Sequence, residues 1–183
     1  IVTRNDYVGL GKKLLADERT HIFKVENGQR IIDVKITFIT EHGDCVLGDK
    51  KDAGFSVRIA TSMDVDSKKG GHIINSKGVT DKDAWGKRAE WVDYYGPVNG
   101  KRVGVAILNH PSSFRHPTPW HVRTYGLFTA NPFGLKSLRQ GKEGAFTLGK
   151  GKSITLRHRV IFHQGDEKTA KIAEAYKAYA KEK

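Results

Sequence analysis

Sulfur is scarce in this sequence, which contains one cysteine, Cys45, and one methionine. A lone cysteine excludes an internal disulfide framework, and a structural thiol is a commoner role for such a residue than a nucleophile. Long apolar runs are also missing, because no stretch reaches the roughly eighteen apolar residues that a membrane-spanning helix needs. We therefore expect a soluble chain without membrane insertion. The chain starts at Ile1 rather than Met, so removal of an export signal is compatible with a periplasmic or secreted protein.

Motifs of the common nucleophile, phosphate and redox sites are absent. There is no GxSxG, no P-loop, no GxGxxG before a helix and no CxxC. His110, His116 and His121 are separated by five and four intervening residues, which is not a recognised metal-ligand spacing. We expect no metal site, and the sequence indicates no particular cofactor.

The formal net charge of +12 raises the question of nucleic acid binding. The lysines, however, occur in short turn-like pairs such as Lys12-Lys13, Lys50-Lys51 and Lys68-Lys69. No basic helix stripe and no RNP, zinc-finger or helix-turn-helix pattern accompanies them. We interpret the charge as a solvated rim on a β-protein, and nucleic acid binding as the weaker hypothesis.

Short alternating segments dominate the chain. The clearest is Gln29 to Thr40, which follows Asn27-Gly28, a strong hairpin signal. A helical pattern occurs only after Asp166, which we place as the N-cap of a C-terminal helix. Further strands are expected at 18–26, 45–47, 55–61, 72–75, 89–95, 103–108, 120–130 and 152–163. The pattern predicts an all-β fold, an antiparallel β-sandwich with one C-terminal helix, formed by residues 1–183 as a single domain.

The stretch from Lys101 to Gly134 carries the chemically capable side chains. If Trp120 to Ala130 is one strand, His121, Arg123 and Tyr125 share one of its faces, because strand side chains alternate with period two. An imidazole, a guanidinium and a phenol suit binding and proton transfer on a polyhydroxylated or carboxylate-bearing ligand. The alternative is a solvated strand face without function.

Residues around this strand extend the candidate site. His110 is a further catalytic candidate, and the substrate-binding candidates are Trp120, Asn109, Asn131, Trp91, Asp93 and Tyr95. The last three share a face of the predicted 89–95 strand, and sugar rings stack on such aromatic side chains. The alternative interpretation is that the tryptophans belong to the core.

Two motifs are distinctive, WHVR-x-YG at residues 120–126 and NPFG at 131–134. They are accompanied by Trp85-Gly86, Trp91-Val92-Asp93-Tyr94 and Asn109-His110-Pro111. Together they resemble a bacterial family of uncharacterised function that is often labelled "methane oxygenase PmoA", over most of the chain from about Gly28. A membrane-embedded monooxygenase subunit does not fit a chain without a membrane span.

The resemblance implies a β-sandwich similar to the galactose-mutarotase-like supersandwich, often encoded beside sugar-processing enzymes. Members are usually longer at the N-terminus, so we expect this chain to lack N-terminal strands of the full family domain. Members often carry Asp where this sequence has Asn109, and an amide cannot act as a general acid or base.

The leading hypothesis is a carbohydrate-active protein that binds a saccharide on the concave face of its sheet. His121 would act as acid and base, Arg123 as a clamp for an anion or hydroxyl, and Trp120 or Trp91 as the stacking platform. Epimerisation, elimination and glycoside cleavage all remain open. The alternative is a non-catalytic carbohydrate-binding or assembly module, completed by a partner chain or an oligomer.

Overall fold

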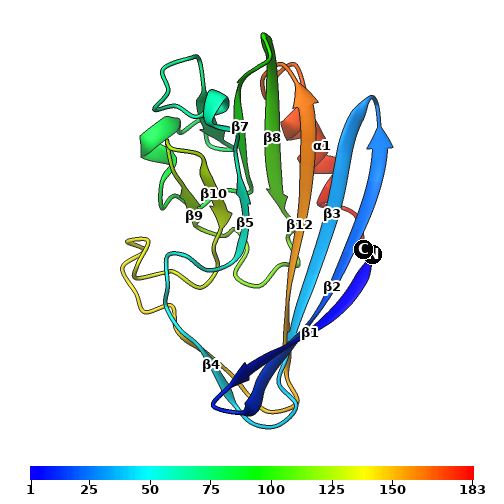
Figure 1. Cartoon of the computed structure of the whole chain (residues 1–183), viewed down its shortest axis with the longest axis vertical. Coiled ribbons are helices and arrows are strands. Elements are labelled where there is room, and N and C mark those ends of the chain that lie inside the picture. Colours follow the sequence, from blue (N-terminus) through cyan, green and yellow to red (C-terminus); the bar gives the residue numbers. More distant parts are fainter.

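Twelve strands and one short α-helix make up the computed structural model, which describes residues 1–183 (Figure 1). The strands are β1 (Val2–Gly9), β2 (Lys12–Glu26), β3 (Gln29–Ile39), β4 (Cys45–Leu47), β5 (Phe55–Arg58), β6 (His72–Asn75), β7 (Trp91–Val98), β8 (Lys101–Asn109), β9 (Trp120–Val122), β10 (Leu127–Ala130), β11 (Phe146–Leu148) and β12 (Ser153–Gln164). The helix α1 spans Ile172–Tyr179, and Thr61–Met63 and Asp81–Ala84 form short 3-10 helices. The predicted antiparallel β-sandwich with a C-terminal helix is confirmed.

The main sheet contains seven antiparallel strands in the order β1-β2-β3-β12-β8-β7-β6. A three-stranded sheet, β5-β10-β9, and a two-stranded ribbon, β11-β4, complete the structure. The β2–β3 hairpin turns at Asn27 and Gly28, with φ angles of 52° and 75°. Both residues have the positive φ that a type I′ turn requires, which explains why this hairpin is readable from the sequence.

The main core lies between the seven-stranded and three-stranded sheets. Alternate residues of β7, β8 and β12 face the smaller sheet, including Val92, Ile107 and Val160. Trp120 and Phe128 pack against them from β9 and β10. Because strand side chains alternate, the intervening residues of β9 and β10 point outward from the small sheet.

The helix α1 covers the opposite face of the main sheet. Its buried Ile172 and Tyr179 pack with Trp91, Leu108 and Ile161. α1 begins later than predicted, with Lys171 in a left-handed conformation at the N-cap position. Asp166 instead accepts the backbone N–H of Thr169 in the preceding turn.

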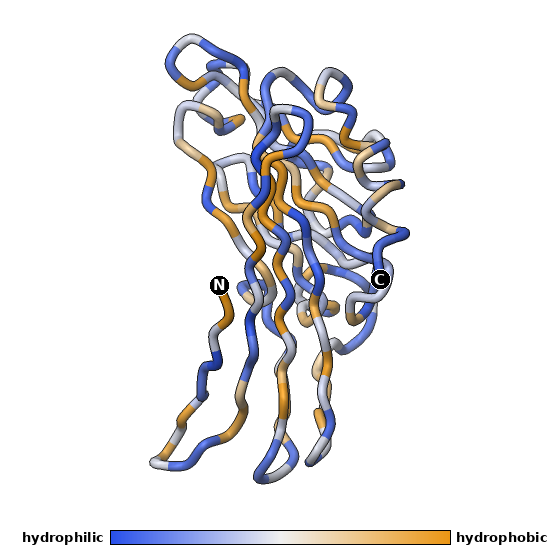
Figure 2. Tube along the Cα trace, turned by 90° about the vertical axis from the view of Figure 1, so that its right-hand side faces the viewer, coloured by the Kyte–Doolittle hydropathy of each residue, from blue (hydrophilic) through white to orange (hydrophobic).

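The strands nearest the N-terminus extend past the small sheet. Figure 2 shows them as long paired segments, in which hydrophobic and hydrophilic residues interleave. β1 and the start of β2 occupy the region before Leu15, which the sequence left unassigned. At the other end of β2, beside the β2–β3 turn, Phe23 and Val25 are 60% and 70% exposed, so that end of the sheet also lacks a covering layer.

The predicted strand Trp120 to Ala130 is wrong as a single element. β9 ends at Val122 and β10 begins at Leu127, and Val122 pairs with Phe128. Gly126, with φ 89°, closes the turn by donating its N–H to the carbonyl of Arg123. The alternating pattern of residues 120–130 concealed a four-residue hairpin turn.

None of the helices combines the length and the apolar composition that a membrane-spanning helix needs.

Candidate functional site

His121 lies on the outer face of the three-stranded sheet, and this position differs from the expected concave face of a larger sheet. Its neighbours Trp120 and Val122 point into the core, so the imidazole points the other way. The residue is 2% exposed because the loop through Lys51 covers it. Only part of the ring edge therefore reaches the surface.

A backbone carbonyl fixes the tautomer of His121. Its Nδ1 lies 2.8 Å from the carbonyl oxygen of Lys51, which can only accept, so Nδ1 carries the proton. Asp52 Oδ1 is 3.9 Å from the same nitrogen, on a largely exposed side chain. Nε2 makes no hydrogen bond within the protein, yet it is not among the buried unpartnered atoms. A lone pair at Nε2 therefore faces solvent, as an acid–base group requires.

Trp85 is the centre of the side-chain cluster around His121. The His121 and Trp85 rings meet edge to face, with centroids 6.3 Å apart and an interplanar angle of 89°. The guanidinium carbons of Arg123 and Arg139 lie 5.8 and 5.4 Å from the indole centroid. Both distances are in the cation–π range. The indole Nε1 is buried without a hydrogen-bond acceptor, so the cluster also holds an unused donor.

Tyr125 extends this cluster across the β9–β10 turn. Its ring is 45% exposed and lies 5.4 Å from the guanidinium carbon of Arg123 and 5.6 Å from that of Arg58. Arg123 is thus connected to both His121 and Tyr125, but the three residues do not share one strand face. The Trp85 ring lies between Arg123 and His121, and Tyr125 meets Arg123 within the β9–β10 turn. We call Arg58, Trp85, His121, Arg123, Tyr125 and Arg139 the arginine–aromatic face.

The three guanidiniums of the arginine–aromatic face have no carboxylate partner. Arg58, Arg123 and Arg139 take part in none of the ion pairs of the protein. Arg139 also has a φ of 60°, a conformation that non-glycine residues rarely adopt and that often marks a functional position. Unpaired, aromatic-stacked guanidiniums keep their planar donors available to an anionic group.

Asn131 holds the loop that orients His121. Its Nδ2 donates to the carbonyls of Lys50 and Lys51, each at 2.8 Å. Its Oδ1 accepts the backbone N–H groups of Phe133 and Gly134. Asn131 is fully buried, so it positions the carbonyl that binds His121 and does not reach a ligand itself.

The structure places His110 apart from His121, which corrects its grouping with the catalytic candidates. His110 Nδ1 is 2.8 Å from Ser112 Oγ, and Nε2 is 3.0 Å from the carbonyl oxygen of Glu182. Its ring packs against Tyr179 of α1. Burial and the nearby positive charge of Arg157 lower its pKa. With both nitrogens occupied, His110 links the β8–β9 loop to the C-terminal segment.

The predicted stacking platforms lie in the core. Trp120 is fully buried and donates its Nε1–H to the carbonyl of Ala89 at 2.9 Å. Trp91 packs under α1. Asp93 and Tyr95 share its face of β7, as alternation predicts, but this face lies across the main sheet from the small sheet that carries His121. These residues therefore cannot complete the arginine–aromatic face.

Asn109 is buried and anchors a loop. Its Oδ1 accepts a hydrogen bond of 2.9 Å from His116 Nδ1 and one of 3.3 Å from the N–H of Thr118. An amide oxygen suits these two donors. The residue supports the proline-containing loop and does not contact the arginine–aromatic face.

Sequence reasoning missed three members of this face, Arg58, Trp85 and Arg139. Trp85-Gly86 was recognised as a motif, but Trp85 precedes His121 by a long loop and two strands, and no local periodicity connects them. Arg58 and Arg139 lie in two further segments, so no spacing rule identifies them either. No group of three or more His, Cys, Asp or Glu side chains is arranged to hold a metal ion.

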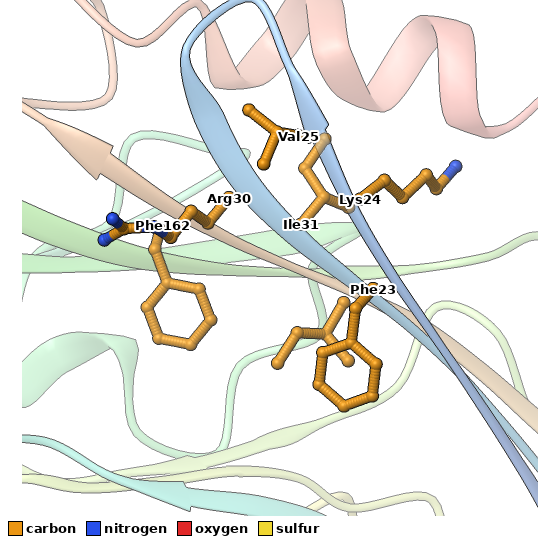
Figure 3. Close-up of a pocket in the computed structure, with 7 residues that line it drawn as sticks. Phe23, Lys24, Val25, Arg30, Ile31 and Phe162 are labelled. Carbon is orange, nitrogen blue, oxygen red and sulfur yellow. The ribbon is translucent and has the colours of Figure 1, made fainter. Parts of the chain in front are cut away.

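A second surface lies on the uncovered ends of β2, β3 and β12, beside the β2–β3 turn. A groove of about 520 Å³ is lined mostly by apolar residues. Figure 3 shows the rings of Phe23 and Phe162 on the same side of these strands, while the ammonium of Lys24 points away. Phe162 is 41% exposed. Exposed aromatic rings in one groove mark an interaction surface more often than an isolated exposed residue does.

Comparison with known proteins identifies the family of this chain but no characterised relative. No curated protein and no solved structure matches the sequence. One family model, described as a family of unknown function, matches residues 1–177. The chain therefore belongs to the family of unknown function DUF6807.

Proposed function

We propose that this protein binds a saccharide at the arginine–aromatic face, with His121 as an acid–base group. The observation that carries the proposal is the Trp85 ring, around which His121 and two unpaired guanidiniums gather. Saccharides are recognised by exposed aromatic rings together with side chains that donate several hydrogen bonds. Tyr125 supplies the exposed ring, in place of the buried Trp120 and Trp91.

The charge of this face favours an acidic saccharide. Arg58, Arg123 and Arg139 present planar donors that match a carboxylate, and no protein carboxylate occupies them. His121 Nε2 lies at the edge of the same cluster and has a lone pair to accept a proton. A carboxylate held by an arginine lowers the barrier to removing the neighbouring carbon-bound proton, because charge develops on it. Epimerisation and elimination fit this arrangement, and glycoside cleavage remains open.

Binding and turnover of oligogalacturonate test the proposal against an uncharged galactose oligomer of the same length. We expect oligogalacturonate to bind the wild-type protein at least tenfold more tightly. Arg123→Gln should weaken that binding at least tenfold, whereas Arg30→Gln, at the start of β3, should leave it within twofold. Equal affinity of the wild-type protein for both oligomers, or unchanged oligogalacturonate binding in Arg123→Gln, would contradict the proposal.

His121→Gln separates catalysis from binding. Loss of product formation, followed by NMR of the sugar protons, with affinity retained within threefold assigns His121 to the chemistry. Wild-type protein that binds but never converts a saccharide would instead support a non-catalytic binding module.

The finer family relationship is part of the same proposal. The WHVR-x-YG and NPFG motifs resemble the group labelled PmoA, with its galactose-mutarotase-like supersandwich. The seven-stranded antiparallel sheet packed against a smaller sheet supports that relationship.

A second candidate function, self-assembly, is favoured by the free edge of β1. β1 pairs only with β2 and has one free edge, a common site of strand addition. If two copies pair antiparallel around Asn5, Arg4 of one copy lies opposite Asp6 of the other, and Val2 opposite Val8. Opposite charges in such cross-strand positions contribute roughly 0.2–1 kcal/mol each.

Native mass measurement tests self-assembly. We expect wild-type protein at twice the chain mass of 20.4 kDa. Val8→Lys should give monomers, because a lysine on an edge strand opposes strand addition. Val46→Lys, an equally exposed valine on β4, should not. A wild-type monomer at high protein concentration would contradict self-assembly.

A further inference from the structure

A cavity of about 440 Å³ lies where three loops meet, outside the arginine–aromatic face. One wall comes from the segment after Trp85, one from the β8–β9 loop and one from the β10–β11 loop. The lining residues are Arg88, Arg115, His116, Leu135, Gln140, Lys142 and Glu143. Three cationic side chains therefore face one carboxylate.

Two guanidiniums in this cavity are half-buried without a carboxylate partner. Arg88 donates from Nη1 to the carbonyl of Pro117 at 2.6 Å and from Nε to Gln140 Oε1 at 3.1 Å. Arg115 donates from Nη1 to the carbonyls of Pro132 and Gly144. These neutral acceptors fix both side chains but leave their charges uncompensated.

Each guanidinium keeps free donors. Arg88 Nη2, and Arg115 Nε and Nη2, make no hydrogen bond within the protein. None of them is among the buried unpartnered atoms, so all three reach solvent. Because both residues line the cavity, these donors are available to a ligand inside it.

The contrast with Arg159 shows what is missing. Arg159 is more deeply buried than Arg88 and Arg115, but it pairs with Asp33 and Glu182. Burial opposes its charge, yet these bonds raise the pKa of its guanidinium. Burial lowers the pKa of Arg88, with no opposing partner. Burial and the charge of Arg88 lower the pKa of Arg115, and Asp49 only partly offsets them.

The remaining groups around the cavity do not neutralise the two arginines. Glu143 uses Oε1 to accept the N–H groups of Gly144 and Ala145 and forms no ion pair. His116 donates from Nδ1 to Asn109 and has a pKa lowered mainly by burial, so it is neutral near pH 7. Lys142 is exposed at the rim and has no partner, so it adds a third positive charge.

We propose that this cavity is a binding site for a tetrahedral dianion, a phosphate or sulfate group, free or carried by a small molecule. Two guanidiniums with free donors, reinforced by Lys142, match the charge and the multiple oxygens of such a group. The volume accommodates an attached group of about monosaccharide size, and Leu135 offers it an apolar wall. The site is separate from the arginine–aromatic face and does not depend on its function.

Thermal unfolding and calorimetry at constant ionic strength test the proposal with inorganic phosphate, sulfate, glucose 6-phosphate and galacturonate. We expect saturable binding of phosphate or sulfate, with a rise in melting temperature that follows occupancy. Tighter binding of glucose 6-phosphate than of phosphate identifies a carried group, and equal binding identifies the free ion. Binding of galacturonate alone, or no saturable binding, would overturn the proposal.

Variants assign the binding to this cavity. Lys142→Glu should weaken phosphate binding at least tenfold, and Lys101→Glu, the same exchange on an exposed strand end, should leave it within twofold. Arg88→Lys keeps the charge but loses the planar fork, and should weaken binding with little loss of stability. If Arg123→Gln abolishes phosphate binding while Lys142→Glu does not, the anion binds at the arginine–aromatic face and the proposal is wrong.

Discussion

His163 Nε2 donates a hydrogen bond of 2.9 Å to Asp93 Oδ1, and both side chains are completely buried. The two residues belong to β12 and β7, which are separated by β8. The imidazole crosses β8 at Gly104, where a Cβ atom would come within 2.3 Å of the ring. His163 Nδ1 also donates to the carbonyl of Gln164, so both ring nitrogens carry protons and the ring is cationic.

Replacing Gly104 should break this buried pair. In Gly104→Ala the new methyl group displaces the imidazole and leaves the Asp93 carboxylate without its partner. Loss of one member of a buried ion pair typically costs about 3–5 kcal/mol. Urea unfolding should show a loss of this size, whereas Gly48→Ala, at an open position without a positive φ, should cost about 1 kcal/mol or less. Similar losses in both variants would mean that the pair contributes little.

The same pair predicts a pH dependence of stability. Burial opposes the charged imidazole, but the hydrogen bond to Asp93 and its charge outweigh it, and the pKa of His163 is raised above 6.5. The folded protein therefore holds a proton that the unfolded chain releases above about pH 6.5. The stabilising contribution is full below that pH and is lost as pH rises through the folded pKa. Urea unfolding between pH 6 and 9 should show this decline, and His163→Gln should remove it.

His158 predicts a pH dependence of stability that is opposite in sign to that of His163. Its ring stacks on Phe55, with centroids 5.0 Å apart, and neither nitrogen has a hydrogen-bond partner. Burial lowers its pKa to about 3, so the unfolded chain binds a proton that the folded protein excludes. Its contribution to stability is full above about pH 6.5 and declines as the pH falls below that value. His158→Leu should therefore flatten the acid side of the stability profile, and an unchanged profile would contradict the assignment.

Local sequence patterns predict strands of the fold, but they do not predict which residues meet in the candidate site. Residues 32–38 alternate strictly and follow the Asn27-Gly28 turn signal, so local rules predict β2, β3 and their hairpin. The β9–β10 hairpin was missed because Val122, Phe128 and Ala130 all lie at even positions, so the alternating pattern continues through its turn. The arginine–aromatic face is assembled from four separate segments, and only the packing of loops brings Trp85 to His121.

The three tryptophans should respond differently to a quencher. Trp120 and Trp91 are buried, whereas Trp85 is partly exposed and lies beside two guanidiniums. Iodide should quench the Trp85 fluorescence preferentially, because the surrounding positive charge attracts the anion. Trp85→Phe should remove the quenchable fraction with a change in unfolding free energy below about 1.5 kcal/mol, whereas Trp120→Ala should cost about 3–5 kcal/mol. A quenchable fraction that survives Trp85→Phe would contradict this assignment.

Asn131 links the fold to the proposed chemistry, because it holds the Lys51 carbonyl that orients His121. Asn131→Asp keeps the shape of the side chain but replaces both Nδ2 donors with an oxygen that faces two carbonyls. The Lys50 carbonyl loses its side-chain donor, the Lys51 carbonyl keeps only the bond from His121, and a charged oxygen now faces both. A loss of about 2–4 kcal/mol in unfolding free energy is expected.

The readout that separates positioning from stability is the proton signal of His121. In wild-type protein, the Nδ1 proton donated to Lys51 should exchange slowly with solvent and be visible by NMR. Asn131→Asp should broaden it and weaken oligogalacturonate binding. Asn99→Asp, the same exchange in an exposed turn, should change neither. A sharp, slowly exchanging signal in Asn131→Asp would show that the Lys51 carbonyl stays in place without Asn131, because the bond from His121 alone is sufficient to hold it.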